Sequence, residues 1–418
     1  MKRGITFLLL MILAITLMFS KEEIVFWYAW GGYEGDALLE LVDEFNAQDH
    51  DFTVRPVYVP IGGGEKIMTT LAGNSTPDVA TVWDWMVVPL GYNDALLPLN
   101  DLLISAGLGP DEYLPNIWDY GVYEDIKYGV PTTLNLYAFM WNKNLFEEFG
   151  FDPDKPPANI EELNKINDTL LKKDSRGNIR RLGFLPVISH IYFYVFGGQL
   201  WDKVTYEITA NHPKNAEALE WVAGVYQKFD PQKIRVFQAS WGDIASKYNP
   251  FYREQLAMQE AGQWEVLFVD KFAPDDFSYG VSAFPAPEGG RNDVAYVNGS
   301  FWVIPKASKN PEKAFEFLSW LIAPEQSARF SAALFNIPPL KEALETEEFQ
   351  KIITPEFNVY LELLRDGFVY NFPTLPIGQF YLNALGSALE KVQTGKATAQ
   401  EALDEVQKNV ENELERYK

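Results

Sequence analysis

Three short apolar runs, separated by a helical pattern and by glycine-rich loops, most constrain how this chain can fold. Residues 24–28, 52–59 and 78–82 each have the length and composition of a buried strand. A helical spacing of Leu38, Leu41, Val42 and Phe45 separates the first two, with Asp36 as its cap, and a short helix over 65–71 precedes the third. This order predicts an α/β fold with parallel strands and right-handed crossovers.

The loops that follow these strands are the first candidate site. Open α/β sheets bind ligands just beyond the carboxyl ends of their strands. Trp30 with Gly31 and Gly32 follows the first strand, the glycine-rich segment 60–64 follows the second, and the segment Trp83, Asp84, Trp85 follows the third. We therefore expect these loops to share one rim. Aromatic rings stack on the apolar faces of sugar rings and carboxylates accept hydrogen bonds from hydroxyls, so such a rim suits a sugar.

The length of the chain predicts two lobes. With 418 residues, 47% of them hydrophobic, it can bury two cores and leave a cleft between them. Changes of pattern near Pro131, Pro285 and Pro324 predict three crossings between the lobes. We expect a first lobe of residues 21–131 and 285–325 and a second lobe of residues 132–284 and 326–418.

The amino-terminal segment predicts export. Lys2 and Arg3 precede an uncharged apolar run over 5–19, shorter than the about 20 residues that cross a bilayer. A cleaved signal peptide over 1–20 is the interpretation, with an uncleaved anchor as the alternative. The chain has no cysteine, hence no disulfide, no thiolate metal site and no lipid-anchoring cysteine at the cleavage point. We expect a periplasmic or secreted protein.

The charge and the motifs exclude several function classes. Aspartate and glutamate number 58 against 35 lysines and arginines, a surface that repels nucleic acid and anionic lipid. His50, His190 and His212 lie far apart, no GxSxG elbow occurs, and residues 62–66 lack the spacing of a phosphate loop. We therefore expect no metal, no cofactor and no activated serine.

Two alternatives to sugar binding remain at this point. Asp84, between two tryptophans, and Glu265, beside Trp264, are carboxylates of the kind that glycoside hydrolases pair, so a secreted hydrolase is one alternative. The acidic composition also permits a cationic solute such as a polyamine. The aromatic and glycine-rich rim favours sugars over polyamines.

Seven segments in a fixed order resemble one family. They are "VFWYAWGG", "LAGNSTPDVATVWDW", "YGVPTTLNLYAFMWNKNLFEEFG", "FGGQLWD", "MQEAGQWEV", "VNGSFWVIPKASKNPEKAFEFLSWL" and "FNIPP". The Gly-x-x-x-x-Ile-Pro and Lys-Asn-Pro-x-x-Ala spacings of the sixth segment are the most specific. Over nearly all of the mature chain the sequence is similar to the extracellular solute-binding proteins of ABC importers, the class typified by maltose-binding protein.

This resemblance implies a two-lobed periplasmic binding protein fold of type II that closes on an oligosaccharide and delivers it to membrane permease subunits. It implies a monomer without catalytic activity. Trp264 is the best stacking candidate, and the loop from Trp83 to Trp85 matches the contact loop of the family. The other candidate ligand-binding residues, matched or adjacent to matched positions, are Trp30, Tyr137, Glu265, Asn298, Gly299, Ser300 and Phe335.

Overall fold

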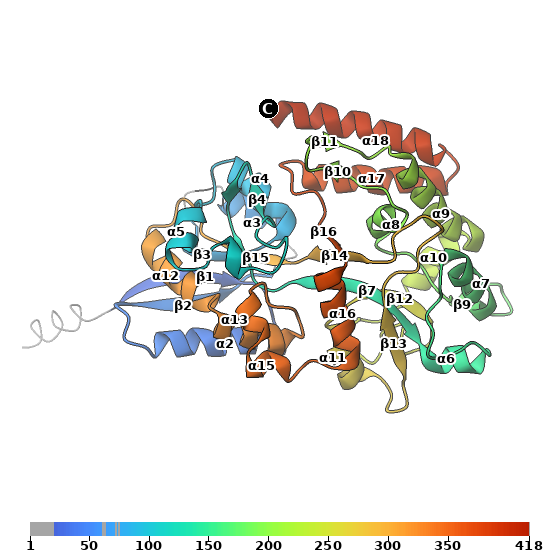
Figure 1. Ribbon diagram of the computed structural model, residues 1–418, viewed down its shortest axis with the longest axis horizontal. Helices are drawn as coiled ribbons and strands as arrows, with labels where there is room; N and C mark the ends of the chain where they lie inside the picture. The colour runs from blue at the N-terminus through green and yellow to red at the C-terminus, as the bar shows by residue number, and fades with distance from the viewer. Residues whose placement is uncertain (1–20, 61–63, 72, 74–75, 418) are drawn as a thin grey trace, which may run out of the picture.

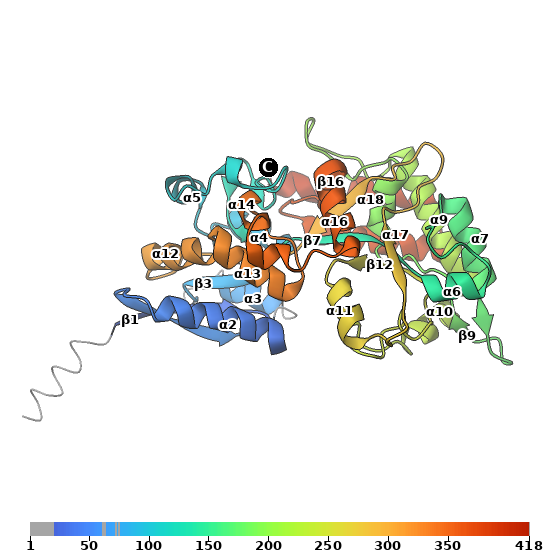
Figure 2. The same cartoon turned by 60° about the horizontal axis from the view of Figure 1, so that its bottom comes forward.

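The computed structural model describes residues 21–60, 64–71, 73 and 76–417. The predicted signal peptide and most of the glycine-rich loop after the second strand lie outside these residues. Figure 1 shows two lobes side by side, with a few segments passing between them in the middle of the molecule, and Figure 2 shows the same division from a second direction. Within the described residues, no helix combines the length and hydrophobicity that crossing a bilayer requires.

The first lobe is built on a five-stranded sheet with the order β2-β1-β3-β15-β6. Strand β1 (Glu22–Tyr28) pairs in parallel with β2 (Phe52–Tyr58) and β3 (Val79–Trp83), which confirms the predicted parallel pairing. Strand β15 (Ser300–Val303) runs antiparallel to both of its neighbours, β3 and β6 (Val130–Pro131). A segment from late in the chain therefore completes the sheet that the first strands begin.

Helices cover this first sheet, and α2 starts earlier than the sequence predicted. Its buried residues Leu38, Leu41, Val42 and Phe45 confirm the predicted apolar face, but Asp36 lies inside the helix rather than at its cap. Gly31 is the cap, and Gly32, with φ of +59°, turns the chain into the helix. The elements of this lobe are α2 (Gly32–Asn46), α3 (Gly64–Leu71), α4 (Asp84–Tyr92), α5 (Asn100–Ser105), η1 (Pro110–Glu112), β4 (Val122–Tyr123), β5 (Ile126–Lys127), α12 (Pro311–Leu321), α13 (Pro324–Leu334), α14 (Lys341–Leu344) and α15 (Glu347–Gln350).

The second lobe contains the sheet β12-β7-β14-β16, with β13 also paired to β7. These strands are β7 (Asn135–Asn142), β12 (Met258–Gly262), β13 (Tyr279–Ser282), β14 (Val294–Asn298) and β16 (Phe368–Tyr370). The larger helices are α6 (Lys143–Glu148), α7 (Ile160–Leu170), α8 (Ser189–Val195), α9 (Pro213–Phe229), α10 (Pro231–Gln238), α11 (Glu265–Phe272), α16 (Pro355–Asp366), α17 (Gly378–Gln393) and α18 (Ala399–Leu414).

Smaller elements complete this lobe: the hairpins β8 (Lys172–Lys173) with β9 (Ile179–Arg181) and β10 (Trp201–Asp202) with β11 (Glu207–Ile208), and the terminal turn η2 (Glu415–Tyr417). Helix α18 begins with a capping box, in which the Thr398 hydroxyl accepts from the Glu401 N–H and the Glu401 carboxylate accepts from the Thr398 N–H.

The chain passes between the lobes three times. The first passage lies between β6 and β7, next to the expected position at Pro131. The second is the single residue Gly299, between β14 of the second sheet and β15 of the first, whereas the sequence placed it near Pro285. The third follows α15 rather than Pro324, because Pro324 opens α13 at its first turn and α13 packs on α2 of the first lobe. The strand β14 (Val294–Asn298) thus belongs to the second sheet.

Candidate functional site

Asp84 is the central polar residue on the first lobe. It ends the loop after β3 and begins α4, and its backbone N–H donates to the Gly299 carbonyl at 3.1 Å. Its carboxylate accepts from the Tyr120 hydroxyl at 2.6 Å and from the Trp85 N–H at 2.8 Å. Burial raises the pKa of Asp84 to about 6, although these hydrogen bonds favour the ionised form. A fixed acceptor of this kind suits a hydroxyl donor on a ligand.

Trp264 is the corresponding aromatic residue on the second lobe. It lies two residues beyond the end of β12, at the start of α11, and its ring meets the Tyr137 ring edge-to-face, with centroids 5.4 Å apart and planes at 89°. A Cβ atom at Gly262 would lie 2.1 Å from the Trp264 ring, so only glycine lets the indole lie against the strand. Both aromatic side chains stay partly exposed. They therefore offer ring faces held by the sheet rather than by a loop.

The structure adds residues that sequence reasoning missed. Tyr296, on β14, has ring centroids at 5.5 Å from Tyr137, 4.7 Å from His190 and 5.2 Å from Tyr370. Tyr296 and Asn298 are two residues apart on one strand, so strand alternation was the signal that could have found Tyr296. No comparable signal points to His190 or Tyr370, which reach this cluster only through the fold.

Several polar atoms of this cluster have no protein partner. His190 Nε2, Asn298 Oδ1 and the Tyr370 hydroxyl are buried and make no hydrogen bond within the described residues. Burial lowers the pKa of His190 to about 4, so its imidazole is neutral near pH 7. Buried polar atoms are normally paired, so such a group of unpaired atoms indicates a place for ligand or water.

Glu260 is a further acidic residue of the second lobe. It lies on β12, which pairs with β7, the strand that carries Tyr137. Its carboxylate accepts from the Ile188 N–H at 2.8 Å and the Val187 N–H at 3.1 Å. Burial nevertheless raises its pKa to about 7. Near neutral pH its carboxyl group is therefore only partly ionised, and the His190 imidazole is neutral.

The two halves lie within electrostatic range of each other. The charge of Asp84 contributes to raising the pKa of Tyr137 and of Tyr296, although burial is the larger cause for both. The register of the first sheet also places Ser300 opposite Trp83, immediately after Gly299 and Asn298. The structure therefore brings together most of the predicted site residues, namely Trp83, Asp84, Trp85, Tyr137, Trp264, Asn298, Gly299 and Ser300.

Four predicted residues are engaged within the protein. The Trp30 ring packs edge-on against Trp302 and Phe330, at 6.5 and 5.0 Å, and stays partly exposed. Glu265 is buried and its carboxylate accepts from Tyr252 and Asn249, at 2.5 and 2.9 Å. The Ser300 hydroxyl bonds the Thr132 hydroxyl, and Phe335 ends α13 in a left-handed conformation with its ring near Phe357. These side chains therefore already have partners within the protein.

A polar network links the passages behind the site. Gln263 is fully buried; its side-chain oxygen accepts from the Leu136 N–H at 2.8 Å and its amide donates to the Leu134 carbonyl at 2.6 Å and to Asn336 at 3.1 Å. Asn336 in turn donates to the Thr133 hydroxyl at 3.0 Å. A Cβ atom at Gly299 would approach the Thr133 carbonyl to 2.8 Å, so two passages touch at backbone distance. These residues, called here the hinge network, hydrogen-bond one another where the passages between the lobes meet.

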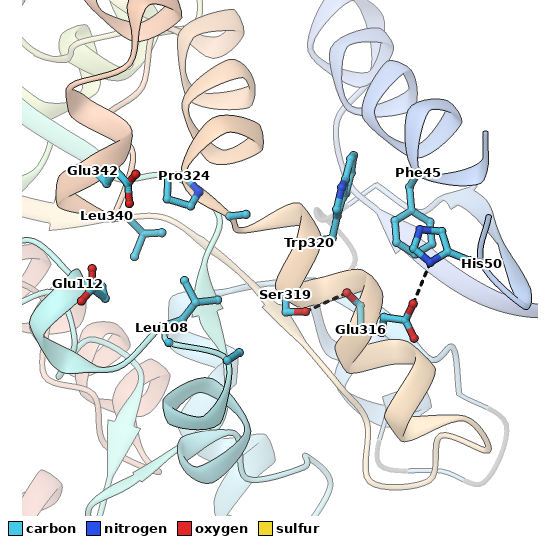
Figure 3. A pocket seen from close by; sticks show the side chains of 13 residues that line it. Phe45, His50, Leu108, Glu112, Glu316, Ser319, Trp320, Pro324, Leu340 and Glu342 are labelled. Carbon is cyan, nitrogen blue, oxygen red and sulfur yellow. Dashed lines mark hydrogen bonds and ion pairs between the residues drawn. The ribbon is translucent and has the colours of Figure 1, made fainter. Parts of the chain in front are cut away.

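A surface cavity of about 470 Å³ lies elsewhere, in the first lobe, and Figure 3 shows it. It opens between α12, α14 and the loop after α5, and none of the predicted site residues lines it. Phe45 stacks on His50 with centroids 3.9 Å apart, and His50 Nδ1 lies 2.8 Å from Glu316. These rings form a wall of the first core. Within the described ranges, no group of three or more His, Cys, Asp or Glu residues is arranged to hold a metal ion.

The protein has two lobes joined by three passages, and polar and aromatic side chains from both lobes meet at their junction. This arrangement is that of a two-lobed binding protein. Residues 31–328 match the family model for bacterial extracellular solute-binding proteins. The chain belongs to this family.

Relatives and solved structures agree with this fold. The sn-glycerol-3-phosphate-binding periplasmic protein UgpB of Yersinia pseudotuberculosis is 24% identical, over 97% of this chain and 96% of its own. The structure of CpMnBP1 with mannobiose bound has a TM-score of 0.81 and 26% identity, over 93% of this chain and 99% of that one. The maltodextrin-binding MalE domain of Bdellovibrio bacteriovorus, bound to maltotriose, has a TM-score of 0.72 and 17% identity, over 94% and 100%.

Proposed function

We propose that this chain binds a neutral oligosaccharide between its lobes and delivers it to the membrane permease of an ABC importer. The observation that carries the proposal is the pairing of the Trp264 and Tyr137 rings with the Asp84 carboxylate across the junction of the lobes. Rings that stack on sugar faces and acceptors for sugar hydroxyls are the two elements that carbohydrate recognition requires. The similarity to a protein with mannobiose bound supports the same ligand class.

The charge of the site favours a neutral ligand over glycerol 3-phosphate, although the relatives named for that ligand are similar over the whole chain. No lysine or arginine of the described residues is among the main causes that shift the pKa values of Asp84, Glu260 and His190. A phosphate ester would need such cations, and the two carboxyl groups would repel it. A polyamine would find only two carboxyl groups there, one of them Glu260 with a pKa raised by burial to about 7, and the paired rings of Trp264 and Tyr137 favour a sugar over it.

Closure follows from the arrangement of contacts. A sugar that touches Asp84 and Trp264 together binds only when the lobes approach, and this difference in affinity shifts the population toward the closed form. Each chain supplies both halves of the site, so a monomer suffices as the binding unit. We further propose that residues 1–20 direct export and that Asp84 and Glu265 bind or position rather than catalyse.

Ligand titrations followed by tryptophan fluorescence and by calorimetry test the proposal. Mannobiose, maltotriose, glycerol 3-phosphate and spermidine are added separately, followed by mass spectrometry of any small molecule that copurifies. We expect saturable binding of a neutral sugar, with the sugar recovered unchanged. Saturable binding of glycerol 3-phosphate or spermidine alone, or hydrolysis of the sugar, would refute the assignment.

The variant Trp264→Ala identifies the site itself. Loss of a stacked ring costs about 1–3 kcal/mol, which lowers affinity roughly fivefold to 150-fold. Trp201→Ala is the matched control, because Trp201 is also a partly exposed tryptophan of the second lobe, on β10. Equal losses of affinity in the two variants would contradict the role of Trp264.

A further inference from the structure

Tyr33 and Lys271 make a direct contact between the two lobes. The Lys271 ammonium lies 3.7 Å from the centroid of the Tyr33 ring, a cation–π distance. Tyr33 stands in the first turn of α2 on the first lobe, and Lys271 in the last turn of α11 on the second. In Figure 2, α2 and α11 face each other from the two lobes.

Glu34 adds a charge to this contact. It hydrogen-bonds the Tyr33 hydroxyl, and burial and the Glu34 charge raise the pKa of Tyr33 to about 12. Burial raises the pKa of Glu34 itself, and the positive charge of Lys271 acts in the opposite direction. Lys271 therefore interacts with both the ring and the carboxylate of neighbouring residues on the other lobe.

The position of the contact connects it to the candidate site. Tyr33 follows the loop of Trp30 and its two glycines, and Lys271 ends the helix that Trp264 precedes. The hinge network around Gln263 and Gly299 is separate from it. Because the lobes are joined covalently only through the three passages, opening them at the hinge separates Tyr33 from Lys271.

We propose that Tyr33, Glu34 and Lys271 form a latch that stabilises the closed arrangement of the lobes, with or without ligand. The contact is largely exposed, with Tyr33 39% accessible. A cation–π contact of this kind shifts an equilibrium by about twofold to fivefold. Such a latch biases closure without preventing release. A second contact, from the Tyr92 hydroxyl to the Tyr417 carbonyl at 3.1 Å, joins the lobes near the carboxyl terminus, which Figure 1 places far from α11.

The absence of cysteine from the chain permits a direct test without ligand. Cysteines replace the exposed residues Glu40 on α2 and Glu161 on α7, and spin labels on them report the distance between the lobes. We expect Lys271→Gln and Tyr33→Leu each to raise the ratio of long to short distances about twofold to fivefold. The double variant should raise this ratio by less than the product of the two single-variant effects, because both substitutions remove the same interaction.

Two controls separate the latch from general effects. Tyr33→Phe keeps the ring face and should retain most of the closed population, and Lys172→Gln removes an equally exposed lysine of the second lobe and should change nothing. An unchanged distance ratio in both Lys271→Gln and Tyr33→Leu would overturn the latch, as would an equal change in Lys172→Gln. Because no ligand is present, failure of the sugar assignment would leave this result intact.

Discussion

The buried acid Glu265 predicts a specific dependence of stability on pH. Its carboxylate is 3% exposed and accepts from Tyr252 and Asn249, and burial raises its pKa to about 7. In the unfolded chain the same carboxyl group ionises near pH 4.5. Between these values the native state holds a proton that the unfolded state has lost, so the free energy of unfolding falls as pH rises. The difference in pKa corresponds to about 3 kcal/mol lost by pH 8.

The variant Glu265→Gln removes this titration, because the amide oxygen of glutamine accepts the same hydrogen bonds without ionising. Denaturant unfolding is measured for both proteins from pH 5 to pH 8. The stability of the variant relative to the natural protein should rise toward alkaline pH, by up to about 3 kcal/mol. Glu148→Gln, at an exposed carboxyl group, should give a constant difference. A difference for Glu265→Gln that does not change over this range would refute the desolvation of Glu265.

Four further variants test the packing. Gly299→Ala places a Cβ atom 2.8 Å from the Thr133 carbonyl and should lower stability by about 1–3 kcal/mol, measured by denaturant unfolding. In contrast Gly224→Ala, on α9 with open space around it, should stabilise by up to about 1 kcal/mol. Thr398→Ala removes the capping box of α18 and should cost about 1 kcal/mol in the same assay. Trp30→Ala should lower the melting temperature as well as any ligand affinity, because its ring packs on the first core.

The parts of the fold that depend on local pattern could be predicted from the sequence. The first three strands pair as their order requires, Trp83 ends β3, and Trp264 lies two residues beyond the end of β12. The passage at Gly299 could not be found, because one short Asn-Gly-Ser step between two apolar runs reads as a turn rather than as a boundary between lobes. The proline and glycine cluster near Pro285 marks only a loop before β14.

The candidate site shows the same limit. Sequence reasoning selected aromatic and acidic residues beside glycines, which identified Trp264 and Asp84. It could not separate a partly exposed carboxylate from a buried one, so it placed Glu265 with Asp84 although Glu265 is only 3% exposed and already accepts from Asn249 and Tyr252. His190 was missed because its neighbourhood with Tyr296 joins segments that are far apart in the chain.

The place of β15 in the first sheet has a consequence for how the protein is made. This strand lies between β3 and β6, so both of those edges stay unpaired until residues 300–303 arrive. The amino-terminal lobe therefore cannot finish folding while most of the chain is still being synthesised, and its rate-limiting contacts are remote in sequence. For a member of an extracellular family, a lobe that cannot fold before its late strand is made is compatible with export of an unfolded chain.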